Sequence, residues 1–422
     1  MLAAVPRRRG APTRGVAVSR RGLWRNRDFV LLMSGQLLSS AGSQLTAVAY
    51  PLLTLAVTHS AASAGLVGFA RMLPAPLLAL IAGDAADRLD RRRIMVGADT
   101  VRTIAVAALG LAVARGDATL IAIVAAALVE GAGGAFFSAA QSGALRAVVP
   151  ASDLPDAVAV QQARFATVAL AGPPAGGALF GVARSLPFIG DACSYAFSFA
   201  ALAAIRRPFQ QPRVTETEPL RRRMSEGFRF LWGNPFLRVT TLIYMAANLT
   251  PPAILLVIVV AGRRAGLSGT RIGLLYALFA ASLLLGSALS PWVRRRLSMT
   301  AIVLIELWLT VASVLFVIWP NVYVLALVIL PQAASMPVTD SAVVGYRIAI
   351  TPDRLLGRSE GVRATLGQTV APVGPLLAGL LLARTSARET VAVFAVCSLG
   401  LALWATFNRA LRSAPALDEL RW

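Results

Sequence analysis

The chain has 422 residues, of which 57% are hydrophobic, and a mean hydropathy of +0.68. This composition excludes a soluble protein, because so much apolar chain requires a lipid solvent, in which helices satisfy their own backbone hydrogen bonds. The net charge of +21 comes from arginine, since the chain has no lysine. The arginines are distributed between apolar stretches rather than gathered in one domain, so we expect no nucleic-acid partner.

Twelve apolar stretches are long enough to cross a bilayer, which takes about 20 helical residues. In chain order they cover 29–57, 61–82, 94–114, 118–140, 157–182, 186–205, 236–262, 272–293, 299–319, 322–346, 359–383 and 390–407. The sequence therefore predicts an all-α membrane protein with twelve transmembrane helices.

The arginines are concentrated on every second connection between these stretches. The N-terminal tail holds eight and the connection between the sixth and seventh stretches holds seven, whereas no connection of the opposite set has more than three. Because arginine-rich short loops mark the cytosolic side, we expect both termini in the cytosol. The first 28 residues lead directly into a full-length span, so no cleavable signal peptide is expected.

The second half of the chain repeats features of the first. Three features recur in the same order: a Leu-Trp-x-Asn at Leu23 and Leu231, a glycine eight residues before three arginines at Gly83 and Gly286, and an arginine nine residues before a proline at Arg164 and Arg363. Each copy holds six spans, so we predict two parallel six-helix bundles with a binding site between them near the middle of the bilayer.

These features divide the chain into five parts. We predict a cytosolic tail over 1–28, a bundle over 29–205, a cytosolic linker over 206–235, a second bundle over 236–407 and a cytosolic tail over 408–422. Within the linker, Leu220, Met224, Phe228 and Leu231 fall at helical spacing among arginines, which favours an amphipathic helix on the cytosolic leaflet. A solvated linker with accidental spacing is the alternative.

The connection between the second and third spans contains a loop with a recognisable spacing. It begins at Gly83 and continues through Asp87, Arg88, Arg91 and Arg92, and it resembles the signature loop of the major facilitator superfamily. The glycine would permit close helix approach, the aspartate would cap the next helix, and the arginines would pair with acids on a neighbouring helix end. Asp90 stands where the family has a second glycine.

A second motif lies in the fifth span, where Gly172, Pro173, Gly176 and Gly177 resemble the core of the superfamily's exporter motif. An earlier glycine of that motif is replaced here by Val168. Proline bends a helix, and glycines allow tight packing against the other half. The resemblance favours export over import.

Over the whole chain, four segments resemble the branch that holds the enterobactin exporter and macrolide efflux proteins. They are the stretch 24–29, the pair Gly35 and Gln36, the loop 87–93 and the bend 372–374. This resemblance implies efflux of a drug, siderophore or secondary metabolite across a bacterial inner membrane, driven by proton antiport. We also expect a monomer. An uptake or facilitative carrier remains an alternative, as does a transport-inactive sensor or scaffold of the same fold.

Charges placed within the bilayer are candidates for proton coupling, because each costs about 2.5–3.5 kcal/mol at a helix centre. Arg71 and Glu130 lie near the middle of the second and fourth spans, where they can pair, and Asp340 and Glu306 lie in the tenth and ninth. Functional and structural roles remain open for these residues. Four further charges have expected structural roles: bracing of the signature loop by Asp99 and Arg102, and snorkelling or gate ion pairs by Arg164 and Arg363.

Uncharged polar residues suggest the lining of a substrate cavity. Gln36, Ser40, Ser43 and Gln44 share one helical face of the first span. Asn248 begins a stretch that interrupts the seventh span and either frames the other wall of the cavity or is a packing kink. The only histidine, His59, lies in an outer loop, which excludes a histidine proton relay. Without lysine there is no phosphate-binding P-loop, and no Cys/His spacing fits a metal. We therefore expect no enzyme activity, cofactor or metal, and as partners a small molecule, protons and lipid.

Overall fold

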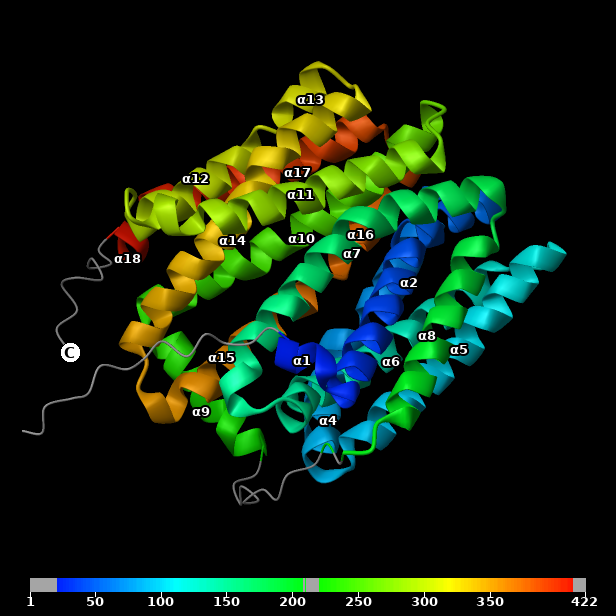
Figure 1. Ribbon diagram of the computed structural model, residues 1–422. Helices are drawn as coiled ribbons and strands as arrows, with labels where there is room; N and C mark the ends of the chain where they lie inside the picture. Colours follow the sequence, from blue (N-terminus) through cyan, green and yellow to red (C-terminus); the bar gives the residue numbers. More distant parts are fainter. Residues whose placement is uncertain (1–20, 208, 210–219, 413–422) are drawn as a thin grey trace, which may run out of the picture.

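The computed structural model describes residues 21–207, 209 and 220–412, and all regular secondary structure in this part of the chain is helical (Figure 1). The first half contains α1 (Arg21–Arg25), α2 (Arg27–Thr58), α3 (Ala61–Met72), α4 (Pro74–Arg88), α5 (Arg91–Arg115), α6 (Leu120–Val148), η1 (Ala151–Asp153), α7 (Leu154–Val182) and α8 (Leu186–Ala204). Most of both predicted tails and of the linker's first part lies outside the described residues.

The second half contains the remaining elements. They are α9 (Leu220–Gly233), α10 (Pro235–Arg264), α11 (Gly269–Arg294), α12 (Met299–Val311), α13 (Val314–Ile318), α14 (Val322–Ile350), α15 (Asp353–Val370), α16 (Val373–Arg384), α17 (Ala387–Phe407) and α18 (Arg409–Arg412). A helix, α9, therefore occupies the second part of the connection between the halves. Its place on the leaflet stays a prediction.

Eleven helical segments of the described chain are long and apolar enough to cross a membrane. The twelfth, α2, has 32 residues but is less hydropathic because of its serines, threonines and glutamines. The predicted twelve-helix fold is confirmed. Several helices continue beyond the predicted spans, most clearly α6, which ends at Val148 rather than residue 140. A helix can extend past the hydrocarbon core, where hydropathy no longer follows it.

The internal repeat is visible in how the first helix of each half begins. Asn26 caps α2 and Asn234 caps α10, and each side-chain oxygen accepts hydrogen bonds from the backbone N–H groups two and three residues later. Asparagine is a favoured N-cap residue because it satisfies these free donors. The two Leu-Trp-x-Asn segments therefore perform the same local task in both copies.

Prolines account for two of the helix breaks and leave other helices continuous. The second span is divided into α3 and α4 at Pro74, and the eleventh into α15 and α16 at Pro372, because proline cannot donate the backbone hydrogen bond. By contrast, α10 runs unbroken through Pro251 and Pro252. The predicted interruption of the seventh span after Asn248 is therefore wrong.

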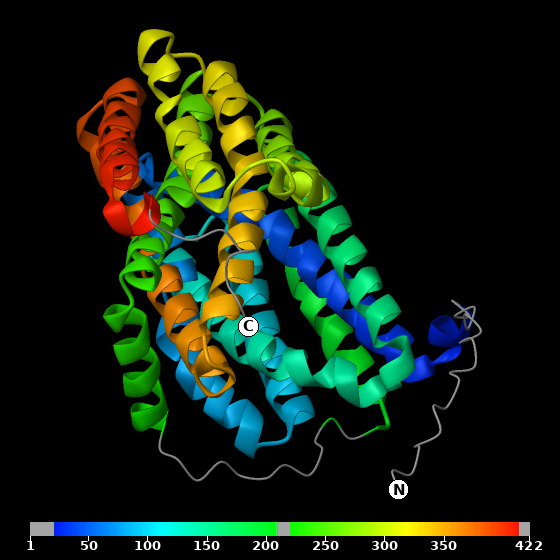
Figure 2. The same cartoon turned by 90° about the vertical axis from the view of Figure 1, so that its left-hand side faces the viewer.

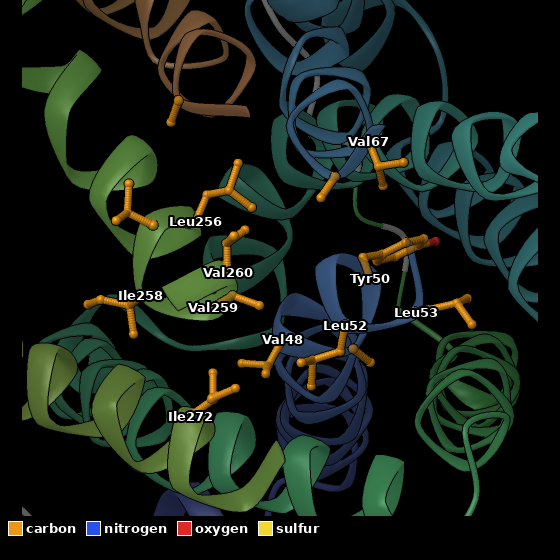
Figure 3. Packing of buried hydrophobic residues seen from close by; sticks show 14 of the residues in the cluster. Val48, Tyr50, Leu52, Leu53, Val67, Leu256, Ile258, Val259, Val260 and Ile272 are labelled. Atoms are coloured by element: carbon orange, nitrogen blue, oxygen red, sulfur yellow. The ribbon is translucent and has the colours of Figure 1, made fainter. Parts of the chain in front are cut away.

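The two halves meet along two helix pairs, α7 with α11 and α3 with α16. The views in Figures 1 and 2 show α7 and α11 side by side. A shared apolar core joins the halves, in which Val48 and Leu52 of α2 lie near Val259 and Val260 of α10 (Figure 3). These two helix pairs are equivalent in the repeat, since the fifth span corresponds to the eleventh and the second to the eighth.

Both pairs contain the same glycine contact. A Cβ on Gly177 of α7 would stand 2.0 Å from the carbonyl oxygen of Gly269 on α11, and a Cβ on Gly65 of α3 would stand 2.9 Å from the Cα of Gly379 on α16. Gly269 follows Gly65 by 204 positions and Gly379 follows Gly177 by 202. Glycine is required here because the backbones themselves touch. These contacts lie at the helix ends that we expect outside.

Candidate functional site

A buried ion pair joins α3 to α6. Nη2 of Arg71 is 2.6 Å from Oε1 of Glu130, and Nε is 3.2 Å from the same oxygen. Nη2 also donates to the backbone carbonyl of Ser43 on α2. The helices approach closely because a Cβ at Gly131 would stand 2.2 Å from the carbonyl oxygen of Arg71. The predicted pairing is present, and its role in coupling stays a prediction.

A second arginine, Arg102 of α5, extends this network. Its guanidinium lies over the ring of Tyr195, 3.8 Å from the centroid, and donates to the Tyr195 hydroxyl and to Oγ of Ser43. It also lies 3.6 Å from Asp99, which is fully buried. Because Arg102 contacts α2 and α8 inside the bundle, its predicted role with Asp99 in bracing the signature loop is wrong.

The network includes a carboxylate that the sequence analysis missed. Asp191 of α8 is fully buried, and its Oδ2 accepts a hydrogen bond of 3.0 Å from the hydroxyl of Thr46. That hydroxyl lies 3.3 Å from Nη2 of Arg71, so it links Asp191 to the ion pair. An acid within an apolar span was the signal that selected Glu130, and it was equally present at Asp191. We call Arg71, Asp99, Arg102, Glu130 and Asp191 the N-half cluster.

The predicted cavity residues of α2 fall into two groups. Ser43 belongs to the N-half cluster's surroundings through its contacts with both arginines. Gln36, two turns earlier, accepts a hydrogen bond of 2.7 Å from Arg164 of α7. Ser40 and Gln44 are half-buried on the same helix. The first span therefore contributes polar groups at two depths rather than one continuous cavity wall.

The C-terminal half has its own charged group between α12, α14 and α15. Arg347 is 1% exposed and its Nε lies 2.8 Å from Oε1 of Glu360, whose Oε2 lies 2.9 Å from Nε of Arg363. Glu306 and Asp340 line, with both arginines, a cavity of about 40 Å³. We call these five residues the C-half cluster. Arg347 escaped selection because the predicted span ends one residue before it.

Asn248 lies outside this cluster. Its Nδ2 is 3.5 Å from the backbone carbonyl of Gly367, so it connects α10 to α15 within the C-terminal half. Beside it, a Cβ at Gly367 would collide with the ring of Tyr244. The predicted cavity role of Asn248 is therefore untested, while its packing role is visible.

Residues of the signature loop contact the start of α5 and the end of α8. Asp90, rather than the predicted Asp87, caps α5 by accepting a hydrogen bond of 2.8 Å from the backbone N–H of Arg92. Asp87 lies 3.5 Å from Arg91. The guanidinium of Arg92 donates to the last carbonyls of α8, where a cation is favoured by the helix dipole, rather than to the predicted acids.

Two further residues of the loop are placed differently from their predicted roles. A Cβ on Gly83 would meet nothing within 4 Å, so the predicted close helix approach is wrong there. Its repeat counterpart Gly286 makes that approach instead, with a Cβ position 1.9 Å from the carbonyl oxygen of Ala334. Arg88 pairs with Asp84 one turn earlier on the exposed surface of the same helix.

The exporter motif faces both halves. A Cβ on Gly177 would stand 2.0 Å from the carbonyl oxygen of Gly269, and a Cβ on Gly273 of α11 would stand 2.3 Å from the carbonyl oxygen of Pro173. The predicted tight packing of this motif against the other half is therefore present. Gly172 and Gly176 pack instead against α2 of their own half, where a Cβ would stand 2.4 Å from Gln44 and 2.3 Å from a backbone oxygen. The motif therefore fixes α7 between α2 and α11.

A cavity of about 150 Å³ lies between the two halves. Residues of α2, α3, α10, α11 and α16 line it, among them Tyr50, Pro252 and Tyr276, and Arg71 is the charged side chain in its wall. The guanidinium thus connects an apolar space shared by both halves to the buried Glu130. Such a space suits a molecule with an apolar body and a polar group.

The chain is similar in sequence to one known protein family and to curated proteins. A family model described as transmembrane secretion effector matches residues 22–420. The multidrug efflux pump Tap of Mycolicibacterium fortuitum is 29% identical over 404 residues, which cover 91% of this chain and 96% of that protein. Tap of Mycobacterium tuberculosis is 29% identical over 412 residues, covering 92% and 94%.

Solved transporter structures share the fold. A bacterial homologue of the human lysosomal transporter Spinster superimposes with a TM-score of 0.73 at 17% identity, over 94% of this chain and 99% of that one. A bacterial homologue of the iron transporter ferroportin gives 0.71 at 15% identity, over 91% and 98%. At these identities the likeness concerns the fold alone.

Proposed function

Because the chain belongs to the transmembrane secretion effector family of the major facilitator superfamily, we propose that it exports small organic molecules from a bacterial cytosol by alternating access. It acts as a monomeric transporter and not as an enzyme, in the inner membrane with both termini in the cytosol. The relatives named as multidrug efflux pumps support a broad range of substrates.

The observation that carries this proposal is the position of Arg71 between a shared cavity and a buried acid. The cavity is bounded by helices of both halves, so a molecule bound there is exposed to one side or the other when the halves move. The repeated glycine contacts between α7 and α11 and between α3 and α16 provide two equivalent places about which the halves can close.

Proton antiport requires a carboxyl group that alternates between its protonated and charged forms. Glu130 fits this need because one oxygen is held by Arg71 while the other, Oε2, is buried without a hydrogen-bond partner in the described part of the chain. Asp340, in the C-half cluster, is exposed to its cavity. We propose these two acids as the coupling groups.

The test measures uphill and downhill transport separately in proteoliposomes. Glu130→Gln and Asp340→Asn should each be assayed for substrate accumulation driven by a pH gradient and for substrate exchange without a gradient. Loss of accumulation with retained exchange in either variant supports coupling by that acid. If both variants still concentrate substrate at the normal rate, neither acid couples. If the unaltered protein moves no substrate, the export function itself is wrong.

The proposed orientation has an independent test. In a variant without native cysteines, a cysteine at Arg358 should react with a membrane-impermeant maleimide only from the cytosol, and one at His59 only from outside. A cysteine at Arg213, in the predicted cytosolic linker, should also react only from the cytosol. This position lies outside the described residues. Reaction of the Arg358 position from outside would contradict the orientation.

A further inference from the structure

The arginine triplets that follow α4 and α11 are related by the internal repeat but differ in the acids around them. Arg294 follows Arg91 by 203 positions, as Gly286 follows Gly83. The same shift relates the three acids of the N-terminal loop, Asp84, Asp87 and Asp90, to Ser287, Ser290 and Val293. The first loop therefore carries carboxylates beside its arginines, whereas the second carries none.

The two triplets also differ in what their side chains contact. Arg91 is 7% exposed and lies 3.5 Å from Asp87, and Arg92 donates to the last carbonyls of α8. Arg294, Arg295 and Arg296 are exposed, and in the part of the chain that the structure describes their guanidinium groups have no carboxylate or carbonyl partner. The C-terminal triplet therefore presents its positive charge to the surroundings of the protein.

A second source of positive charge lies beside this triplet. The hydroxyl of Thr300, in the first turn of α12, donates a hydrogen bond of 2.9 Å to the carbonyl of Leu411, so α18 lies next to the start of α12 (Figure 1). Arg409 and Arg412 of α18 are exposed and likewise have no acidic partner among the described residues. No acid occurs between residues 286 and 305. We call Arg294, Arg295, Arg296, Arg409 and Arg412 the arginine patch.

An apolar stripe on α11 leads to the arginine patch. Its side chains are between 44% and 57% exposed and belong to Leu274, Leu278, Leu285, Leu289 and Trp292. Their separations of four, seven, four and three residues place them on one helical face. The packed side of α11, with Ser290 against Ser341 of α14 and Gly273 against Pro173 of α7, points away from this stripe. The stripe therefore faces the lipid.

Trp292 and Arg296 join the stripe to the patch. Arg296 follows Trp292 by about one turn, and its guanidinium carbon lies 4.5 Å from the centroid of the indole ring. Tryptophan is enriched where the hydrocarbon of a bilayer meets the headgroups. The stripe thus ends, and the arginines begin, at the depth where a phospholipid changes from acyl chain to phosphate.

A phospholipid with a net negative charge matches both parts of this surface. The preference of arginine for the cytosolic side accounts for the place of the patch but not for its lack of acids, because the N-terminal loop lies on the same side and keeps three. We propose that this end of α11 binds an anionic phospholipid of the cytosolic leaflet, with its acyl chains along the stripe and its phosphate at Arg295 and Arg296. The inference does not depend on the proposed export function.

The first test compares the lipids that contact Trp292. The protein is reconstituted in mixtures of phosphatidylglycerol and phosphatidylcholine, one of which carries brominated acyl chains that quench tryptophan fluorescence. The signal of Trp292 is the difference between the unaltered protein and Trp292→Phe. We expect phosphatidylglycerol to quench this signal at a several-fold lower mole fraction than phosphatidylcholine.

Variants separate this site from the general charge of the protein. Arg295→Gln with Arg296→Gln should lower the preference for phosphatidylglycerol at least about fivefold, because each arginine near the membrane surface adds to the attraction. Arg295→Lys with Arg296→Lys should keep most of the preference, since lysine retains the charge. The matched control, Arg88→Gln with Arg93→Gln, removes the same charge from the N-terminal loop and should change nothing at Trp292. Variants are compared only after gel filtration shows that they fold.

The second test separates a lipid from a free phosphate. Phosphatidylglycerol added to the protein in detergent should raise the unfolding temperature of the unaltered protein and leave that of Arg295→Gln with Arg296→Gln unchanged. Glycerol phosphate at the same concentration should change neither. Equal quenching by the two lipids, an unchanged preference in the glutamine variant, the same loss in the matched control, or equal stabilisation by glycerol phosphate would each overturn the inference.

Discussion

The N-half and C-half clusters each contain three acids and two arginines, yet they distribute countercharge in opposite ways. In the N-half cluster the arginines are separated, Arg71 beside Glu130 and Arg102 beside Asp99, and hydroxyl groups connect them. In the C-half cluster one acid, Glu360, holds both arginines. The first arrangement meets a cavity through an arginine, Arg71, whereas the second leaves acids facing a cavity. The repeat does not relate these positions, since the counterpart of Arg363 is Arg164, which contacts Gln36 outside the N-half cluster. The two bundles therefore reach similar charge counts with different residues.

The largest expected effect comes from removing an arginine of each cluster. Arg71→Met should lower the free energy of unfolding by about 3–5 kcal/mol, because Glu130 is left buried without its countercharge. Arg363→Met should cost less, because Glu360 keeps Arg347. Thermal unfolding of both variants in detergent measures the difference, and Arg71→Met with Glu130→Met is the matched control that should recover stability. Equal losses in the two halves would end the comparison.

The second effect tests where the halves are alike. Gly177→Val and Gly65→Val should both abolish transport, because an added side chain collides with backbone of the opposite half at repeat-related positions. Gly181→Val is the control, since a Cβ there meets nothing within 4 Å. Transport in proteoliposomes is the measurement. Normal transport in one glycine variant and none in the other would show that the two contacts are not equivalent.

The fold could be predicted from the sequence because hydropathy and arginine placement report directly on the bilayer. Span ends were less predictable, since α6 and α14 continue as helices beyond their apolar parts. The site was predicted in part. An acid in an apolar span is visible in the sequence. This signal is present at both Glu130 and Asp191, but only Glu130 is among the predicted site residues. Which face of a helix meets a neighbouring helix depends on packing, so the sequence predicts the wrong contacts for Arg102 and Gly83.

A smaller effect concerns the signature loop between α4 and α5. The equivalent loop of the C-terminal half precedes α12, which Ser298 caps. Asp87→Asn should lower the transport rate while leaving substrate affinity within a few-fold, because it weakens the contact with Arg91 far from the shared cavity. Asp84→Asn, which removes the exposed pair with Arg88, is the control and should change neither. A large loss of affinity in Asp87→Asn would place this loop at the substrate site.

The smallest effect belongs to the surface contact between α9 and α15. Partial desolvation raises the pKa of the Glu226 carboxyl, but the Arg358 guanidinium, which donates a hydrogen bond to that carboxylate within an ion pair, holds its pKa below the usual range. A carboxyl whose folded pKa is lowered stabilises the folded state above its unfolded pKa and loses that contribution as pH falls through the folded value. Acidification should therefore loosen α9 from α15.

Spin labels on α9 and α15 can follow this separation between pH 7 and pH 3. We expect a slight increase in distance at acid pH in the unaltered protein. Glu226→Gln and Arg358→Gln should each give the longer distance at both pH values, because neither retains the charge pair. The N-terminal half, whose cluster acids are buried within the bundle, should show no comparable change between labels on α2 and α8. If α9 separates equally in Glu226→Gln when the pH is lowered, another group controls the contact, and this connection between the halves is not held by Glu226.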